Sequence, residues 1–506
     1  MNRKWYGVTF LAVVLYCALL VAHALTRRPW TDEAMFADPA FTLISKGYLG
    51  CPVEEFAYAW PNLARHVYMP FPLNLVVLAG WFKIVGFGLI QQRVLSMLWT
   101  GILLFSIYRL IGVLLQDART ALWCTVLVAL DYQIMVAGSF GRYDPMVAAL
   151  GFCGYLLYLS LREKHLHLAL ILANTAVMLA GTTHPNGLLY FFGLWVLVLY
   201  HDRRRLGWRQ VALSAVPYVA GGLVWGAYVM QDPRTAIAQL SSSSWNRVSI
   251  LHPWLALKRE ILLRHGPGFG LIGPHSAGTR GPVQLKAVPL LAYVSGVIGC
   301  CAVPALRRHP GCRTLLLLTM VHLLYLTFFE GIKFAFYLEH LNPLYAVMLG
   351  IFTAWLWRSG RAPKLAVASA MALVLAIEVG GIVMRVRINT YGEHYAPALA
   401  FVKRHASPKD LVVGSPDFGF GYGFESNFRD DPLVGFNSGV VPEFIVWDAD
   451  IYQDEFDKNA LTKPDAHRYI VAMLRQYDSV FHNDGYTIYR RRADAGPPPP
   501  GEPFGK

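Results

Sequence analysis

An acidic pair, Asp32 and Glu33, follows the first apolar run of the chain almost directly. A carboxylate in this place could take a proton from a hydroxyl group, which is the task of a general base. A structural role is equally open, because Thr31 or Asp32 could cap a helix over residues 33–47, EAMFADPAFTLISKG. Solvated carboxylates at a membrane edge are the third interpretation.

Two further motifs place polar side chains beside helix-breaking residues. In residues 141–145, GRYDP, Asp144 could be a helix N-cap with Pro145 at the first helical position, and Arg142 could be its ion partner. In residues 183–187, THPNG, proline and glycine predict a tight link between two spans. His184 needs a further reason, since a polar ring at membrane depth usually faces a cavity or a partner. Substrate binding by Arg142, Asp144 and His184 is the functional alternative.

The fourth motif contains Lys333 and Tyr337 within residues 330–340, EGIKFAFYLEH. A cation and a phenol one helical turn apart could hold a phosphate where lipid meets water. Alternatively, Lys333 snorkels to the interface and Tyr337 belongs to an aromatic belt. Together with Asp32, the motif favours sugar transfer from a lipid phosphate. In that chemistry a carboxylate takes the acceptor's proton, and fixed cations stabilise the departing phosphate.

The elements that must position these residues are membrane helices. The chain has 506 residues, 55% hydrophobic and only 15% charged, whereas soluble domains have about 25% charged residues. The net charge of +13 does not indicate nucleic-acid binding, because the lysines and arginines lie between apolar segments, as the positive-inside rule expects. The seven cysteines form no CxxC motif, so neither a zinc site nor a disulfide framework is supported.

Charge parity predicts how the chain crosses the bilayer. Twelve apolar runs are long enough to consider, and the first is interpreted as an uncleaved membrane helix rather than a signal peptide. The basic connectors between later spans lie on the same side of the membrane as the N-terminus only if one apolar run near the N-terminus does not cross the membrane. The best candidate is 71–89, interpreted as an interfacial helix. We therefore expect eleven spans and a cytoplasmic N-terminus, although Arg27 and Arg28, outside the first span, contradict the charge rule. The runs are 5–25, 71–89, 92–115, 119–138, 145–161, 166–182, 187–201, 210–230, 284–304, 313–329, 337–356 and 364–383.

This topology places all four motifs on the outer face of the cytoplasmic (inner) membrane and predicts an outward-facing site. The composition changes after the last span, which divides the chain into a membrane module (1–384), a small α/β domain (385–495) and a disordered Pro- and Gly-rich tail (496–506). Within the α/β domain, EHYAPALAFVKRHASPKD predicts an amphipathic helix, and LVVGSP, DSVFHNDG and YTIYRRR predict short strands.

The ordered set of motifs resembles the GT-C glycosyltransferases, in particular the protein O-mannosyltransferases and the bacterial lipid A aminoarabinose transferases. The resemblance covers most of the chain in order. It rests on the Asp-Glu pair after the first span, the Pro-x-Pro-Leu segment at 69–73, Arg-x-Asp at 142–144, Lys-x3-Tyr-Leu at 333–338 leading to Pro343, and GYTIYR at 485–490. The fold that this implies is a polytopic α-helical membrane protein of about eleven spans, with interfacial helices in the first outer loop and a small extracytoplasmic α/β domain.

The resemblance also implies a polyprenyl-phosphate sugar donor, inversion at the anomeric carbon, and Asp32 as general base. Glu33 and Asp144 would shape the site or bind the acceptor, which could be a lipid, a polysaccharide or a protein. Donor phosphate would be bound by Lys333 and Tyr337 and by a basic residue of the outer loops, for which the candidates are Arg65, His66, Arg247, Arg259 and Arg264. No cofactor is firmly predicted. The carboxylates and His184 could bind a divalent metal, but no ligand spacing supports it.

Two other functions compete with this one. A transporter or flippase for a lipid-linked substrate would need ionisable residues near the bilayer midplane, and Glu378 fits that need. A membrane scaffold that presents residues 385–495 would leave Asp32, Asp144, His184 and Lys333 without a shared reason. The sequence therefore favours a glycosyltransferase.

Overall fold

The structure is a computed structural model that describes residues 3–57, 60–244, 250, 252–269 and 283–501. The chain forms two compact units. The first comprises Met1–His23, Arg93–Gln231 and Ser243–Arg385, and the second comprises Ala24–Gln92, Asp232–Ser242 and Val386–Lys506. The segment after the first apolar helix thus belongs to the same unit as the C-terminal domain.

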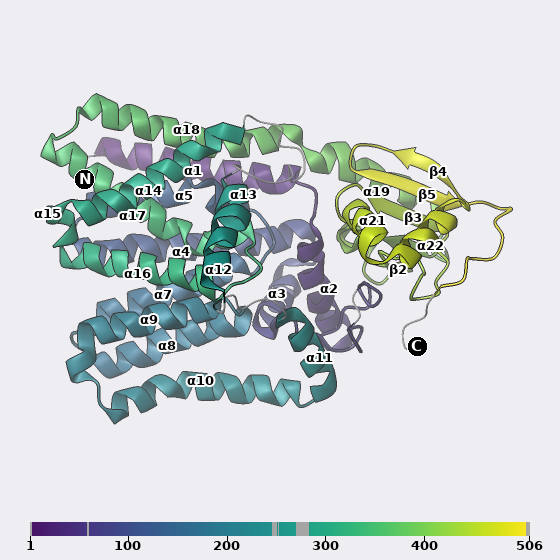
Figure 1. Cartoon of the computed structure of the whole chain (residues 1–506), viewed down its shortest axis with the longest axis horizontal. Coiled ribbons are helices and arrows are strands. Elements are labelled where there is room, and N and C mark those ends of the chain that lie inside the picture. The colour runs from purple at the N-terminus through teal and green to yellow at the C-terminus, as the bar shows by residue number, and fades with distance from the viewer. Residues whose placement is uncertain (1–2, 58–59, 245–249, 251, 270–282, 502–506) are drawn as a thin grey trace. The chain divides into compact units, whose positions relative to one another are not determined.

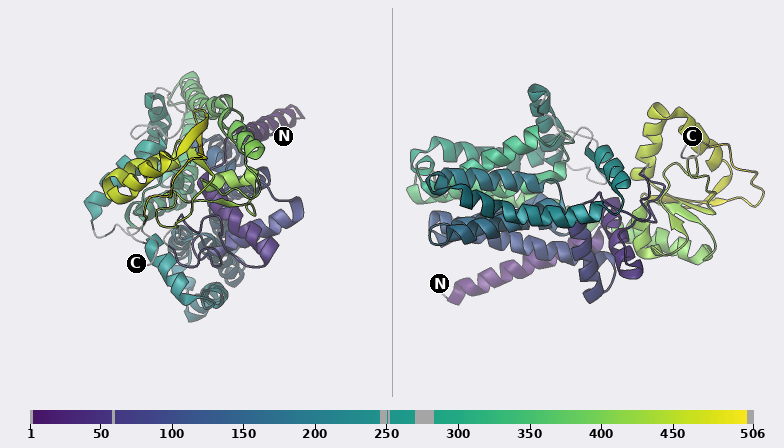
Figure 2. Two further views of the ribbon diagram at one scale, coloured as in Figure 1. Left: turned by 90° about the vertical axis from the view of Figure 1, so that its right-hand side faces the viewer. Right: turned by 90° about the horizontal axis from the view of Figure 1, so that it is seen from below.

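The first unit is a bundle of long helices, drawn lengthwise in Figure 1 and nearly end-on in the left view of Figure 2. Neighbours in sequence pack together in α7, α8 and α9, while α17 packs against both α5 and α14. Glycine permits a close approach of α14 to α17: a Cβ on Gly296 of α14 would lie 2.5 Å from the Cα of Leu349 on α17. The main helices are α1 (Arg3–Thr26), α4 (Leu89–Leu115), α5 (Ala118–Ala129), α6 (Tyr132–Gly138), α7 (Asp144–Leu161), α8 (Leu166–Thr183), α9 (Gly187–Asp202), α10 (Trp208–Val229), α14 (Ala287–Ala302), α16 (Pro310–Phe328), α17 (Asn342–Ser359) and α18 (Lys364–Ile388).

Six helical segments among the described residues are long and apolar enough to cross a membrane, or seven if the bent pair α5–α6 counts as one span. The chain is therefore a polytopic membrane protein, as predicted, while the number eleven is not confirmed. The run predicted not to cross forms α3 (Pro72–Val85), which has 14 residues. At about 1.5 Å per residue, α3 is shorter than a hydrocarbon core of about 30 Å. The six segments are Leu89–Leu115, Asp144–Leu161, Leu166–Thr183, Trp208–Val229, Pro310–Phe328 and Lys364–His405.

Two predicted runs differ from the observed helices. The run 119–138 is broken between α5 and α6, whose axes differ by 68°. The cause is Asp131, whose side chain accepts the backbone N–H of Ile134 at 3.0 Å and starts a new helix. The run 337–356 begins later than predicted, because the 3₁₀ segment η4 (Ala335–His340) precedes α17.

The second unit contains a five-stranded sheet in the order β2-β1-β3-β5-β4. β1 is parallel to β2 and β3, whereas β5 is antiparallel to β3 and β4. This confirms the strands predicted from LVVGSP, DSVFHNDG and YTIYRRR, and the predicted amphipathic helix is α19. The elements are α2 (Thr31–Lys46), α3, α11 (Pro233–Ser244), α19 (Ala396–His405), β1 (Val412–Gly414), β2 (Phe428–Arg429), β3 (Phe444–Asp448), α21 (Ile451–Thr462), α22 (Pro464–Leu474), β4 (Tyr477–His482) and β5 (Tyr486–Arg491).

One face of this sheet is covered by α21 and α22. Alternate β3 residues, Ile445 and Trp447, point to the same face and pack with Tyr452 of α21 and Ile470 of α22 in a single buried cluster. The acidic pair predicted to do chemistry begins α2 in this same unit.

Candidate functional site

The acidic pair occupies the first turn of α2, with different surroundings for its two carboxylates. Glu33 is fully buried, and its side chain accepts the backbone N–H of Trp30 at 3.0 Å. The backbone carbonyl of Glu33 in turn accepts a hydrogen bond from Gln92 Nε2 at 2.9 Å. Asp32 is only partly buried. Glu33 thus fixes the start of the helix, while Asp32 beside it is less buried.

The predicted N-cap is wrong in detail. Trp30 is the N-cap residue, and Thr31 and Asp32 already belong to the helix. In place of a side-chain cap, the Glu33 carboxylate accepts a hydrogen bond from the backbone N–H of Trp30, just before the helix. Because this reach depends on the long Glu side chain three residues into the helix, a search for Ser, Thr, Asp or Asn at the cap position does not find it.

Asp38, one turn further along α2, anchors the helix to the neighbouring loop. Its Oδ2 accepts the backbone N–H of Val53 at 3.1 Å, and the Val53 carbonyl accepts the N–H of Asp430 at 2.8 Å. Burial raises the pKa of Asp38 to about 7, opposed by the Val53 N–H and by Lys46. The middle of α2 is therefore tied to the C-terminal domain through a carboxyl group that is fully buried.

In the first unit, Arg142 and Asp144 form a buried ion pair with 2.7 Å between Nε and Oδ2. The Arg142 guanidinium also lies over the ring of Phe336, 4.0 Å from its centroid. The predicted ion partnership is confirmed, but Asp144 is the first residue of α7 rather than its N-cap, which is Tyr143. The two charges neutralise each other within an aromatic enclosure.

His184 follows α8 in the predicted tight link and is stacked on Tyr143, with 4.5 Å between ring centroids. Its Nδ1 accepts the backbone N–H of Asn186 at 3.1 Å, so in the neutral ring the proton lies on Nε2. That nitrogen is 3.4 Å from the hydroxyl oxygen of Tyr337, which it reaches as a donor. Two of the sequence-predicted site residues, His184 and Tyr337, are therefore in direct contact.

Lys333 is fully buried and paired within the protein. Its Nζ donates to the carbonyls of Leu326 and Thr327, each at 2.6 Å, and lies 3.1 Å from Glu260 Oε2. Lys333 also has φ 66°, outside any helix, so the predicted spacing of one helical turn to Tyr337 is wrong. Burial lowers the pKa of Lys333, and the neighbouring Glu260 opposes that shift.

A second buried cation, Arg264, completes this cluster. Its Nε lies 2.9 Å from Glu260 Oε1, and its Nη2 pairs with Glu330. The π-helical turn η2 (Glu260–His265) places both Glu260 and Arg264 inside the protein. The guanidinium carbon of Arg264 lies 6.0 Å from the ring centroid of Tyr337. Tyr337 therefore contacts His184 and lies near the buried Arg264.

Comparison with known proteins yields matches only among solved structures. No protein-family model matches the chain, and no curated protein matches it. ArnT from Cupriavidus metallidurans bound to undecaprenyl phosphate superposes with a TM-score of 0.61 at 13% identity, covering 98% of this chain and all of that one. The Archaeoglobus fulgidus oligosaccharyltransferase tethered with an acceptor peptide gives 0.56 at 11% identity, covering 97% of this chain and 75% of that one.

The chain has the GT-C glycosyltransferase fold. The likeness runs through the helices of the first unit and the sheet of the second, since it covers nearly all of the chain. The expectation drawn from the short motifs is thereby confirmed at the level of the fold.

On this GT-C scaffold, the predicted site residues fall into two groups. Arg142, Asp144, His184, Lys333 and Tyr337 are brought together in the first unit. The second unit holds the acidic pair and two basic candidates from the first outer loop. Arg65 is exposed. His66 is half-buried, and its backbone carbonyl accepts a hydrogen bond from Gln239 Nε2 of α11 at 2.8 Å.

The three arginines considered for the later loop differ in burial. Arg264 is fully buried beside Tyr337, Arg259 is half-buried at the end of α12 (Pro253–Arg259), and Arg247 lies outside the described residues. The sequence analysis missed the two carboxylates that pair with the buried cations, Glu260 and Glu330. A signal was present, since Glu260 and Arg264 are spaced i, i+4 and Glu330 opens the same motif as Lys333.

The carboxylates and His184 were considered above as ligands for a divalent metal. Within the described ranges, no group of three or more His, Cys, Asp or Glu side chains could hold a metal ion. Both ring nitrogens of His184, the histidine considered as a ligand, are engaged by Asn186 and Tyr337.

Proposed function

We propose that this protein is a glycosyltransferase that moves a sugar from a polyprenyl-phosphate donor to an acceptor at the outer face of the cytoplasmic membrane. The observation that carries the proposal is the end-to-end likeness to an ArnT structure bound to undecaprenyl phosphate. It is supported by an acidic pair at the start of α2, in which Glu33 is buried and Asp32 is only partly buried. The acceptor is a lipid, a polysaccharide or a protein.

In this reaction the acceptor hydroxyl attacks the anomeric carbon of the sugar from the side opposite the phosphate. Asp32 takes the hydroxyl proton as the new glycosidic bond forms, and the bond to the phosphate oxygen breaks, which inverts the anomeric configuration. Polyprenyl phosphate leaves with the bonding electrons. Glu33 positions the turn that carries Asp32, because its own carboxylate is engaged by the backbone.

Binding of the donor phosphate is assigned to Lys333 and Tyr337, with Arg264 as the loop arginine favoured by its burial beside them. Both cations are already paired with Glu260 and Glu330. A phosphate would therefore have to compete with these carboxylates, so that donor binding loosens the pairs as it forms its own. Arg65, His66 and Arg259 remain candidates as more exposed phosphate contacts.

The acceptor contacts are assigned to Arg142, Asp144 and His184. Arg142 and Asp144 are paired with each other, and His184 is stacked on Tyr143. These contacts hold the three side chains in fixed orientations, which suits recognition of polar groups on an incoming acceptor.

The test is sugar transfer by the purified full chain in lipid nanodiscs, with a panel of polyprenyl-phosphate sugars. Wild type is compared with Asp32→Asn and with Asp465→Asn, a control at an exposed carboxylate of α22. Removal of the base should lower the rate roughly 10²- to 10⁴-fold, and the control should leave it unchanged. Full activity in Asp32→Asn would refute the base assignment. Absence of transfer from every donor would refute the proposed function.

A transporter or flippase is the second candidate, and one observation favours it. At the break between α5 and α6, the Tyr293 hydroxyl donates to Asp131 at 2.7 Å and lies 3.5 Å from Glu378, whose other oxygen accepts the N–H of Tyr132. Buried carboxylates at a broken membrane helix are typical of transport sites. Translocation of a fluorescent polyprenyl-phosphate lipid that is lost in Glu378→Gln, without any sugar transfer, would establish this alternative.

A further inference from the structure

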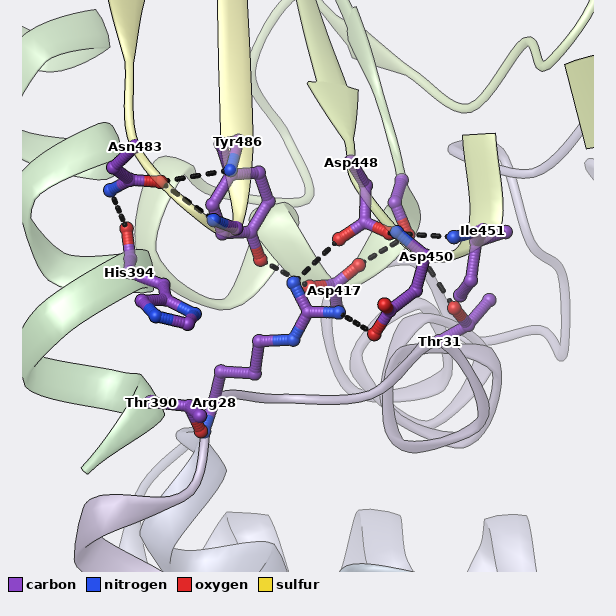
Figure 3. A network of polar contacts seen from close by, with 12 residues as sticks. Arg28, Thr31, Thr390, His394, Asp417, Asp448, Asp450, Ile451, Asn483 and Tyr486 are labelled. Carbon is purple, nitrogen blue, oxygen red and sulfur yellow. Dashed lines mark hydrogen bonds and ion pairs between the residues drawn. The ribbon is translucent and has the colours of Figure 1, made fainter. Parts of the chain in front are cut away.

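Arg28, in the short link between α1 and α2, is the centre of a polar network with the C-terminal domain (Figure 3). Its Nη1 lies 2.8 Å from Asp448 Oδ2, and its Nη2 pairs with Asp450. The guanidinium lies over the ring of Tyr486, 5.4 Å from the centroid, and the backbone N–H donates to Thr390 Oγ1 at 3.0 Å. Arg28 thus makes contacts with four residues near the C-terminal end of the chain.

The carboxylate that Arg28 meets is itself fixed. Asp448 ends β3 and is 2% exposed, and its Oδ1 accepts the backbone N–H groups of Asp450 and Ile451 at 2.8 and 2.7 Å. This leaves Oδ2 pointing at Arg28, as Figure 3 shows. The strand end thus presents a rigid acceptor, so the ion pair transmits the position of the sheet to the link.

A second connection reaches the other end of the same link. The Tyr486 hydroxyl donates to Asp417 at 3.1 Å, Ser415 Oγ also contacts Asp417, and Ser415 Oγ lies 3.4 Å from Thr31 Oγ1. Thr31 is the first residue of α2 and directly precedes Asp32. The C-terminal domain therefore contacts this part of the chain at two places, at Arg28 within the link and at Thr31 directly after it.

Charge explains why the guanidinium is needed at this position. Asp417, Asp448 and Asp450 gather around one arginine, and burial together with Asp448 raises the pKa of Asp417 to about 7. Without Arg28, these carboxylates would repel each other at the strand end. The network also accounts for an arginine that the predicted topology leaves on the wrong side of the first span, since its partners are acidic groups of the folded protein.

We propose that Arg28 is a positioning residue, through which the C-terminal sheet holds the first turn of α2 and the Asp32 carboxylate in reacting geometry. The proposal rests on the proposed function and deepens it. The C-terminal domain is then a working part of the catalytic apparatus.

The test compares Arg28→Lys and Arg28→Gln with Arg492→Gln, a control that breaks an exposed ion pair with Asp478 on the same sheet. A displacement of about 1 Å can cost roughly 100-fold in rate, so Arg28→Gln should lower kcat by that order with donor KM changed less than about threefold. Arg28→Lys keeps the charge and should restore about a tenth of the wild-type rate. The control should match wild type, because exposed pairs contribute little.

Hydrogen exchange gives a readout that does not depend on transfer. In Arg28→Gln the backbone amides of residues 33–35 should exchange faster by roughly 100-fold, with the amides of α7 and α8 unchanged. Protected amides, or faster exchange with an unchanged kcat, would overturn the positioning role. If Arg28→Gln does not fold, an unchanged kcat in Arg28→Lys still overturns it. If the wild-type protein transfers sugar from none of the donors, the proposed function is overturned, and with it the role of Arg28 in catalysis through Asp32. The exchange data would still show whether Arg28 holds the first turn of α2.

Discussion

Replacement of Asp38 by asparagine should make the protein more stable above pH 7 and lower its stability near pH 4 by about 1 kcal/mol. The side chain is fully buried on α2, where it accepts hydrogen bonds from the Val53 N–H and the Thr42 hydroxyl. Its pKa is raised by burial from 3.8 to about 7. In the folded protein Asp38 is therefore neutral at moderately acidic pH, and asparagine mimics that neutral form.

The sign follows from proton binding. Between pH 4 and 7 the folded state holds a proton on Asp38 that the unfolded state has lost, so the free energy of unfolding falls as pH rises. A difference of about three pKa units at about 1.4 kcal/mol each amounts to a loss of about 4 kcal/mol, complete above pH 7. Asparagine avoids that loss but rearranges one hydrogen bond, which costs about 1 kcal/mol. The net gain at pH 8 should be about 3 kcal/mol.

The assay is denaturant unfolding in detergent micelles from pH 4 to 8, followed by tryptophan fluorescence. Glu54 and Asp430 are also buried carboxyls with raised pKa values, so the wild-type slope contains their contributions. The difference between wild type and Asp38→Asn reports Asp38 together with its effect on Glu54, whose pKa the Asp38 charge helps to raise, and Asp465→Asn serves as an exposed control. Parallel curves for wild type and Asp38→Asn across this range would refute the reasoning.

Two predictions concern the first unit. Asp144→Asn removes the carboxylate that pairs with the buried Arg142 and should lower the free energy of unfolding by about 3–5 kcal/mol, measured by the same unfolding assay; a change below about 1 kcal/mol would show that the pair is solvated. Tyr337→Phe removes the acceptor of the buried His184 Nε2–H, which should lower stability by about 1–3 kcal/mol and raise the donor KM, whereas an unchanged KM would exclude Tyr337 from phosphate binding.

Much of the fold was predictable because its signals are local. Long apolar runs indicated membrane helices, and alternation with turn residues indicated the strands of the C-terminal sheet. The helix over 119–138 was predicted wrongly because Asp131 looks like one polar residue in an apolar run. Its effect depends on the side chain turning back to the Ile134 N–H, which composition does not reveal. The N-caps at Asp32 and Asp144 failed for a similar reason, since each helix starts one or two residues earlier.

The candidate site was predictable in its residue types but not in its pairings. The sequence alone determined that an acidic pair follows the first apolar helix and that Arg142, His184, Lys333 and Tyr337 lie in short polar motifs between spans. Hydropathy and turn chemistry act over a few residues, so one sequence suffices to find them.

Only the tertiary structure decided which charges meet. It paired Lys333 and Arg264 with Glu260, and it paired Arg28 with Asp448, 420 residues away in the chain. The physical reason is that a buried charge is tolerated only beside a counter-charge, and the chain can supply that counter-charge from any distance in sequence. Arg28 therefore looked like an exception to the charge rule until its partners at the end of β3 were in view.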